Sequence, residues 1–356
     1  MGLFDPKFEK EKLHKNYLEV LRTVQAEDRQ EFIRWFSGFP DRDGKLVDEF
    51  QTTFNSTFWE IYLYQTFSSF GASFDWGHAA PDFDISIGGK DLIIEATIAS
   101  NTQGKTPEWE KDLSMPLPEK FKFRPMNIES IIRLANAVTS KQAKYHKSYK
   151  DKPHVSNKPF VLAIAPFEQP YFNLQYETPV MALLFDYYID EDAYNKNPEA
   201  YPNGPPGVSL GYVEKDNGSK IQLGMFENKD YAEISAIIFS TTATWGKVEA
   251  MSKNMNIDRT IFSVWYSENI DSPVKIETPN ILYSERIQDG LIVIHNPYAT
   301  IPLDPSVFEV SGVTQIFVDK VTRKIRHQRN GNVLMHRQVI NIPKSMRANK
   351  LINSDA

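Results

Sequence analysis

Residues 81–97, PDFDISIGGKDLIIEAT, constrain the fold more tightly than any other segment of the chain. Two short apolar alternations flank Gly88 and Gly89, and this dipeptide favours the tight turn of a β-hairpin. The segment therefore predicts two antiparallel strands. Glu95 lies within the apolar run of the second strand, a position where a carboxylate needs a partner to offset its burial.

The acidic residues of this segment are expected to converge at one edge of the sheet. Side chains alternate between the faces of a strand, so Asp82 shares a face with Asp84, and Glu95 shares a face with Thr97. Carboxylates that meet in a hairpin repel one another unless a proton or a cation neutralises them. Oxygen donors without nearby His or Cys suit a hard ion, which predicts Mg²⁺ or Mn²⁺ as the cofactor. The competing interpretation is that the two aspartates are solvated residues at a hairpin end and that Glu95 is salt-bridged.

The composition narrows the classes of protein that remain. The chain has 356 residues, of which 41% are apolar and 13% aromatic, and this is enough for a substantial core. Its 40 basic and 46 acidic residues give a net charge of −6, so no global field attracts nucleic acid or a membrane. The absence of cysteine excludes disulfides, thiolate metal sites and cysteine nucleophiles. The sequence has no recognisable secretion signal or membrane span, which predicts a soluble cytoplasmic protein.

Hydrophobic periodicity predicts the order of the elements. We expect amphipathic helices within 8–36, one helix over 46–70, strands over 73–77, 83–89 and 91–99, a helix over 127–150 and a buried strand over 160–167. The remainder reads as β-rich, with a hairpin around Asn217-Gly218 and a flexible insertion or boundary at 194–207. The predicted division is an N-terminal helical segment (1–45), a core (46–170) and a β-rich extension or second domain (171–356).

The order of helix, three strands, helix and strand, with PDFD in the second strand and IIEAT in the third, resembles the core of the PD-(D/E)XK nuclease superfamily. The likeness covers residues 50–167. It implies the restriction-endonuclease-like fold: an α/β fold with an αβββαβ core and a mixed central sheet, here with N-terminal helices and a β-rich C-terminal extension. It also implies that Asp82, Glu95 and the backbone carbonyl of Ala96 hold the metal, and that Glu60 on the first helix assists.

The sequence departs from the family pattern at Thr97, where the family has a lysine two residues after the metal-binding acid. That lysine orients the attacking water and offsets negative charge on the reacting phosphate, whereas a threonine hydroxyl carries no charge. Members of the family can move the lysine to a neighbouring element, and the next helix offers Lys141 and Lys144, one turn apart. Arg133 and Lys147 of the same helix are expected to contact nucleic acid. The competing interpretation is that these residues form a solvated helix face.

A second basic stretch lies near the C-terminus. Residues 320–350 include nine Lys and Arg residues and no acid, against the negative balance of the whole chain. Arg323, Lys324, Arg326 and Arg329 of this stretch are expected to neutralise phosphates. The competing interpretation is a solubilising edge without a partner.

These features predict a metal-dependent endonuclease that hydrolyses phosphodiester bonds, with DNA rather than RNA as its partner. The resemblance also allows a homodimer, and no membrane is expected to take part. One alternative is a nucleic-acid-binding module on the same fold that has lost catalysis, for which Thr97 is the best support. The other is a metal-free glycoside-type hydrolase that uses Glu60 and Glu95 as acid and base.

Overall fold

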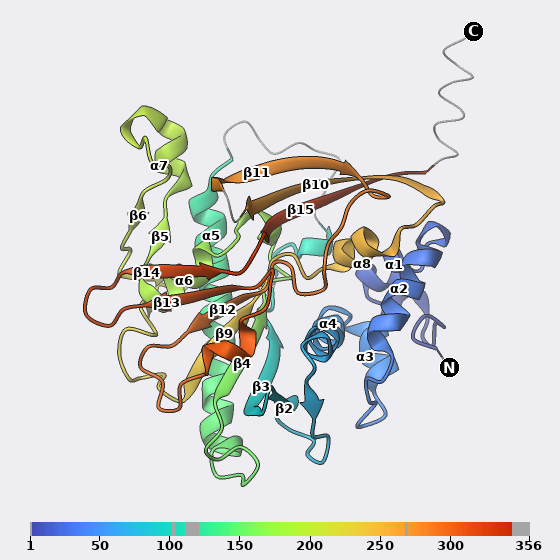
Figure 1. The fold of residues 1–356 in the computed structure, drawn as a ribbon, viewed down its shortest axis with the longest axis horizontal. Coiled ribbons are helices and arrows are strands. Elements are labelled where there is room, and N and C mark those ends of the chain that lie inside the picture. Colours follow the sequence, from blue (N-terminus) through green and yellow to red (C-terminus); the bar gives the residue numbers. More distant parts are fainter. Residues whose placement is uncertain (1, 102–103, 111–120, 268–269, 344–356) are drawn as a thin grey trace.

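The computed structural model describes residues 2–101, 104–110, 121–267 and 270–343. Its centre is a mixed sheet of eight strands, which are Ser73–Phe74 (β1), Phe83–Ile87 (β2), Lys90–Ile98 (β3), Phe160–Ala165 (β4), Ile234–Phe239 (β9), Ile292–His295 (β12), Thr314–Val318 (β13) and Ile325–Arg329 (β14). They follow the order β1-β2-β3-β4-β9-β12-β13-β14 (Figure 1). The pairs β3–β4, β4–β9 and β12–β13 are parallel, and the other neighbours are antiparallel. The chain is therefore an α/β protein with a mixed central sheet, as predicted.

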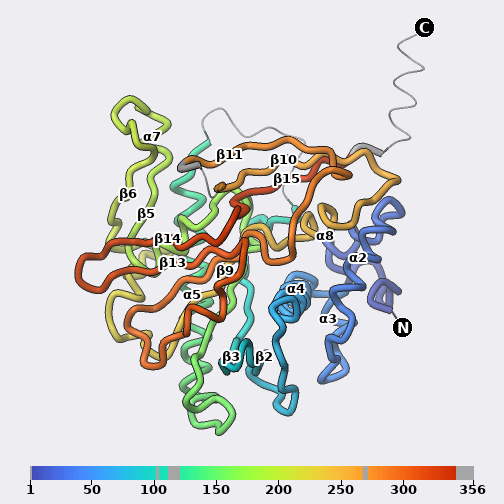
Figure 2. The backbone as a smooth tube through the Cα atoms, in the orientation of Figure 1, coloured from blue at the N-terminus to red at the C-terminus, as the bar shows by residue number. Residues whose placement is uncertain are grey.

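Helices cover both faces of this sheet (Figures 1 and 2). The helices are Lys15–Val20 (α1), Ala26–Phe36 (α2), Leu46–Thr52 (α3), Asn55–Ser69 (α4), Phe123–Lys144 (α5), Thr178–Phe185 (α6), Glu191–Lys196 (α7) and Trp245–Ser252 (α8). Short 3₁₀ turns lie at Lys10–Lys12, Thr23–Gln25, Glu108–Glu110, Phe172–Leu174, Pro198–Ala200 and Pro305–Phe308. Within β4, Val161 and Ala163 belong to one hydrophobic cluster with residues of α2 and α4, whereas Leu162 and Ile164 belong to a second cluster with residues of α5 and α6. Because both of its faces are covered, β4 is apolar throughout, as expected of a central strand.

The hairpin that the sequence predicts at 81–97 is confirmed. β2 and β3 are antiparallel, and their register pairs Ile87 with Lys90 and Phe83 with Ile94. Gly88 and Gly89 both have positive φ, +57° and +75°. A two-residue turn of this kind needs positive φ at both positions, which glycine adopts without strain.

Residues 46–70 form two helices, α3 and α4, so the prediction of one continuous helix is wrong. The chain turns at Phe54, a buried residue with φ of +37°. The turn lets the rings of Phe50 and Phe58 both stack against Phe32 of α2, with centroids 5.4 and 5.3 Å away. The aromatic spacing continues across the break, so periodicity alone does not mark it.

The second half of the chain extends the central sheet and adds a smaller one. β9 pairs in parallel with β4, so residues 46–170 and 171–356 contribute strands to the same sheet. Three antiparallel strands, Ile257–Ser267 (β10), Ile270–Pro279 (β11) and Val333–Pro343 (β15), form a separate sheet in the order β11-β10-β15. Two short pairs complete the strands: Tyr188–Ile189 (β5) with Gly207–Val208 (β6), and Tyr212–Glu214 (β7) with Lys220–Gln222 (β8). The pair β7–β8 confirms the hairpin predicted around Asn217-Gly218.

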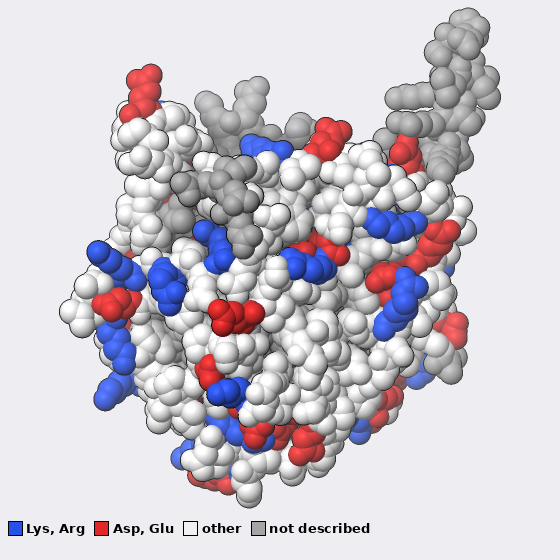
Figure 3. Space-filling model, viewed as in Figure 1, with Lys and Arg blue, Asp and Glu red and all other residues white. Residues whose placement is uncertain are grey.

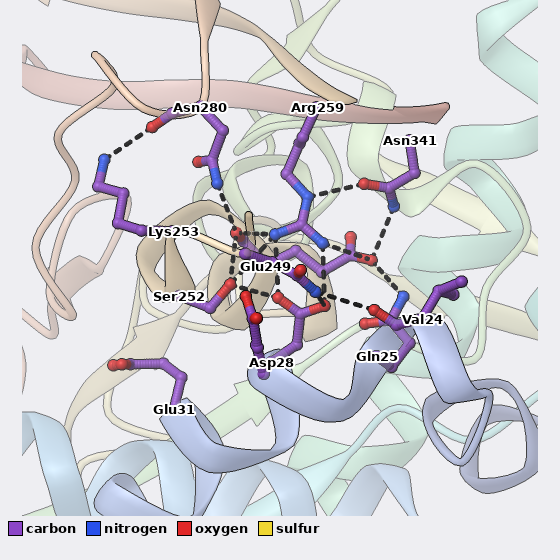
Figure 4. A network of polar contacts seen from close by, with 12 residues as sticks. Val24, Gln25, Asp28, Glu31, Glu249, Ser252, Lys253, Arg259, Asn280 and Asn341 are labelled. Atoms are coloured by element: carbon purple, nitrogen blue, oxygen red, sulfur yellow. Dashed lines mark hydrogen bonds and ion pairs between the residues drawn. The ribbon is translucent and has the colours of Figure 1, made fainter. Parts of the chain in front are cut away.

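A buried ionic network ties the N-terminal helices to the second half (Figure 4). Arg259 of β10 donates to both carboxylate oxygens of Asp28 on α2, at 2.9 and 3.0 Å, and both side chains are fully buried. Its Nε donates to Asn341 of β15 at 2.7 Å, and Ser252 of α8 also donates to Asp28. A bidentate guanidinium–carboxylate pair combines charge with fixed geometry. The network therefore sets how α2, α8 and the small sheet meet.

No helix in the described ranges combines the length and apolarity that crossing a bilayer requires. The region 194–207, predicted to be a flexible insertion or boundary, includes the end of α7, the turn Pro198–Ala200 and the start of β6.

Candidate active site

Glu95 lies in the middle of β3 with 1% of its surface exposed. Its Oε1 accepts hydrogen bonds from Lys141 Nζ at 2.7 Å and from Lys144 Nζ at 2.8 Å. Its Oε2 accepts a third bond from the hydroxyl of Tyr149 at 3.0 Å. A buried carboxylate is tolerated when charge and hydrogen bonds compensate its lost hydration. This explains how a strand interior accommodates Glu95.

Helix α5 brings Lys141 and Lys144 to the sheet. Lys141 and Lys144 are three residues apart, so they share a face of the helix and can both contact Glu95. The helix is fixed against β3 and β4 by buried apolar side chains, including Ile131, Leu134 and Val138. Burial opposes the charge of Lys144, but hydrogen bonds to Glu95 and Tyr149 outweigh it and raise the pKa of Lys144 above its usual value.

Asp82 immediately precedes β2, and its Oδ2 accepts a hydrogen bond from the backbone N–H of Ala96 at 2.7 Å. The register Phe83–Ile94, continued by one pair, places Asp82 opposite Glu95. Since the N–H and C=O of one strand residue point to the same side, the carbonyl of Ala96 also faces this edge. Burial and then repulsion from Glu95 raise the pKa of the Asp82 carboxyl to about 6.

Glu60 reaches the same region from α4, which packs against β3. Burial, followed by repulsion from Asp82, raises the pKa of Glu60 to about 8, although Arg42 opposes this shift. Glu60 therefore holds a proton at neutral pH. Glu60 thus lies close enough to Asp82, and to a lesser extent to Glu95, for their charges to affect its ionisation.

The donor set suits a hard divalent ion. The candidate ligands are the carboxylates of Asp82 and Glu95 and the carbonyl of Ala96, which are oxygen donors of the kind that Mg²⁺ and Mn²⁺ prefer. Within the described ranges, no three Asp, Glu, His or Cys side chains are grouped so that they could hold an ion by themselves. An ion here would therefore be completed by the carbonyl, by water and by substrate. A cation would also relieve the repulsion that raises the pKa of Asp82.

Thr97 and Asp84 differ in what they can contribute. Thr97 lies two residues after Glu95, on the same face of β3, and is half-buried. Asp84 was expected to share a face with Asp82, and its Oδ1 accepts a hydrogen bond from Lys158 Nζ at 2.5 Å. Asp84 is therefore engaged in an ion pair within the protein.

Two helix residues predicted to contact nucleic acid are not brought to Glu95. Arg133 forms an ion pair with Glu129, one turn earlier on α5, with Nε and Oε1 3.1 Å apart. Lys147 lies beyond the end of α5 and is exposed. Their contact with nucleic acid stays a prediction.

The basic stretch of the C-terminal half lies far from the carboxylates. Arg323, Lys324, Arg326 and Arg329 belong to the turn between β13 and β14 or to β14 itself. β14 is the fifth strand beyond β3 in the sheet, which corresponds to roughly 24 Å at the usual strand spacing. Arg323 pairs with Glu227, and Arg329 stacks on Tyr266 at 3.8 Å, so both are engaged within the protein. The part of the basic stretch beyond residue 343 lies outside the described residues.

The sequence did not predict the contact of Tyr149 with Glu95 or the contact of Lys158 with Asp84. Tyr149 does not follow the α-helical spacing of Lys141 and Lys144, so no periodic signal pointed to it. Lys158 lies two residues before the start of β4, and its pairing with Asp84 depends on the parallel packing of strands far apart in sequence.

Comparisons with protein-family models, with curated proteins and with solved structures find no match to this chain.

Proposed function

We propose that this chain is a divalent-metal-dependent endonuclease of the PD-(D/E)XK superfamily that cuts DNA. One observation carries the proposal: Lys141 and Lys144 both reach Glu95, at 2.7 and 2.8 Å. The helix thereby supplies, beside the predicted metal-binding acid, the positive charge that Thr97 lacks. If the two lysines only formed a solvated helix face, they would not both contact one buried carboxylate.

The order of elements supports the restriction-endonuclease-like fold. Along the chain, α4, β1, β2, β3, α5 and β4 follow one another as in the αβββαβ core. β2 and β3 are antiparallel, and the crossover through α5 returns the chain to pair in parallel with β3. The acids lie where this fold would place them, at the start of the second strand and within the third.

In the proposed mechanism, Asp82, Glu95 and the Ala96 carbonyl would hold Mg²⁺, which supplies Lewis-acid polarisation of the phosphate and lowers the pKa of a bound water. The ammonium groups of Lys141 and Lys144, which pair with Glu95, would lie beside a bound phosphate and offset the negative charge that develops on it. The Thr97 hydroxyl can orient the attacking water from the same face of β3.

Glu60 contributes to the charge balance of the site. Because its pKa is raised to about 8, it adds no negative charge at neutral pH and does not repel an incoming phosphodiester. A fixed carboxylate at this position would add to the repulsion between Asp82 and Glu95.

DNA is the proposed partner on the strength of the family resemblance. In the view of Figure 3, basic and acidic side chains are interspersed, and several Lys and Arg gather at the edge where β13 and β14 lie. The exposed residues Lys324 and Arg326 on this edge would contact the phosphate backbone outside the catalytic centre. A homodimer would let two such centres act on the two strands of a duplex.

A catalytically inactive DNA-binding module on the same fold is the second candidate. It is favoured by the contacts of Glu95, whose two oxygens are both engaged by side chains of this chain. The lack of charge on Thr97 also favours this candidate. In this case Glu95 would be a structural residue, and DNA binding would persist when it is replaced.

Cleavage assays separate these candidates. Linear, circular and single-stranded DNA and RNA are incubated with the protein in Mg²⁺, Mn²⁺ or EDTA, using wild type, Glu95→Ala and the exposed control Glu199→Ala. The proposal predicts metal-dependent DNA cleavage by wild type and Glu199→Ala that is lost in Glu95→Ala. DNA binding without cleavage by any of the three proteins would favour the inactive module.

The glycoside-hydrolase alternative rests on the raised pKa of Glu60, which would suit a general acid. It needs no metal. Hydrolysis of an aryl glycoside in EDTA, lost in both Glu60→Gln and Glu95→Gln, would support that alternative over the nuclease.

A further inference from the structure

Tyr149 is a buried residue of the candidate site, and it contacts the oxygen of Glu95 that the lysines do not contact. Its side chain is 2% exposed, and its hydroxyl donates to Glu95 Oε2 at 3.0 Å. Lys144 Nζ lies 5.1 Å from the centre of its ring. The two lysines occupy Oε1, so Tyr149 provides the contact that fixes the other carboxylate oxygen.

A change of helix type places Tyr149 on this face. After α5 ends at Lys144, residues Tyr145–Tyr149 form a π-helical turn, closed by a bond from Lys150 N–H to Tyr145 O at 3.0 Å. In an α-helix, side chains five residues apart diverge by about 140°. In a π-turn the hydrogen bond joins residues five apart, which brings them close to alignment along the axis. The turn therefore brings Tyr149 back to the side of Lys144.

Packing holds the ring in place once the turn has oriented it. Tyr149 lies edge-on to Phe160, the first residue of β4, with ring centroids 6.3 Å apart. The ammonium group of Lys152 also lies near the ring, with its Nζ 5.8 Å from the ring centre. The position of the hydroxyl is thus fixed by the sheet and the turn rather than by solvent.

We propose that Tyr149 is a positioning residue for the metal ligand Glu95, and that the π-turn exists in this chain to place its hydroxyl. The inference rests on the proposed function of the site. A carboxylate ligand that is already oriented loses less conformational freedom when it binds an ion, and hydrogen bonds from outer groups tune its basicity. Without the hydroxyl, only the lysine contacts to Oε1 restrain rotation of the Glu95 carboxylate about its terminal torsion.

The test replaces the hydroxyl and leaves the ring. Tyr149→Phe keeps the packing with Phe160 and the cation contact, and it removes the contacts of the hydroxyl with Glu95 and Lys144. Calorimetric titration of Mn²⁺ into metal-free protein, without DNA, measures the effect on ion binding. We expect Mn²⁺ affinity to fall by about 10-fold or more, with a similar rise in the Mg²⁺ concentration that gives half-maximal cleavage.

A second pair of variants tests the turn itself. Insertion of one alanine after the exposed Ser148 adds a residue before Tyr149 and rotates Tyr149 away from the side of Lys144 while keeping its hydroxyl, whereas Ser148→Ala leaves the length of the turn unchanged. We expect the insertion to weaken Mn²⁺ binding as Tyr149→Phe does, and the substitution to behave as wild type. Melting curves of all variants show whether each protein is folded, and the insertion carries the test if Tyr149→Phe is not.

The outcomes separate this inference from the proposed function. Weaker Mn²⁺ binding by folded Tyr149→Phe or by the folded insertion variant supports the positioning role. Wild-type Mn²⁺ affinity in both, with Glu95→Ala still abolishing binding, overturns the role and leaves the proposed function in place. Wild-type protein that neither binds Mn²⁺ nor cleaves DNA overturns both.

Discussion

Glu60 makes the stability of the metal-free protein depend on pH, and the sign follows from its raised pKa. The carboxyl keeps its proton up to about pH 8 in the folded protein but ionises near 4.5 when unfolded. Between these values the folded state binds one more proton than the unfolded state, so the free energy of unfolding falls as pH rises. Each unit of pKa difference corresponds to ~1.4 kcal/mol, and the half-buried carboxyl retains part of its hydration, so we expect a loss on the order of 3 kcal/mol between pH 5 and pH 9.

Replacing Glu60 with Gln isolates this contribution. The amide resembles the protonated acid but does not titrate, so Glu60→Gln should match wild type near pH 5 and exceed its stability at pH 9. Urea unfolding in EDTA at pH 5, 7 and 9 measures the difference, with Glu199→Gln as an exposed control. Parallel pH profiles for wild type and Glu60→Gln would show that Glu60 ionises normally in the folded protein and would refute the electrostatic description of the site.

Other predictions concern the buried network and the lysines. Arg259→Leu leaves Asp28 buried without its bidentate partner and should lower the free energy of unfolding in urea by about 3–5 kcal/mol, whereas the double variant Arg259→Leu/Asp28→Leu should lose clearly less than the sum of the single variants. Additive losses would contradict that pairing. Lys141→Met should reduce the rate of plasmid cleavage by about 10²-fold or more without lowering the melting temperature by more than a few degrees. Thr97→Lys, which restores the family lysine on the face of Glu95, should recover part of the cleavage rate in the Lys141→Met background, and no recovery would place the lysine's role elsewhere.

Local patterns predicted the elements that carry the site. The alternation around Gly88 and Gly89 gave the hairpin because strand period and turn geometry are both short-range properties. The helical spacing of Lys141 and Lys144 placed them on one face, and the crossover that a parallel strand requires brought this face over Glu95.

The features that the sequence did not reveal depend on contacts between distant segments. The break at Phe54 is stabilised by aromatic packing against Phe32, which helical periodicity does not encode. The pairing of Arg259 with Asp28 joins residues 231 positions apart, and the π-turn at Tyr149 interrupts the helical period on which the prediction relied.

The order in which the strands of the second half pair was also not predicted from the sequence. Its apolar runs predicted strands, but which of them continue the central sheet and which form the sheet β11-β10-β15 depends on long-range packing. The basic stretch near the C-terminus shows the same limit: Arg329 stacks on Tyr266, and Arg337 is buried beside Glu285, so composition alone overstated the charge available to a phosphate backbone.

The central claim is that the carboxylate of Glu95 supports metal-dependent phosphodiester hydrolysis. The most direct measurement is the rate of supercoiled plasmid cleavage as a function of Mn²⁺ concentration, for wild type and for Glu95→Gln, which keeps the size of the side chain and removes its charge. We expect cleavage that saturates with Mn²⁺ in wild type and falls by about 10³-fold or more in Glu95→Gln. Cleavage that persists in EDTA, or that is equal in the two proteins, would contradict it.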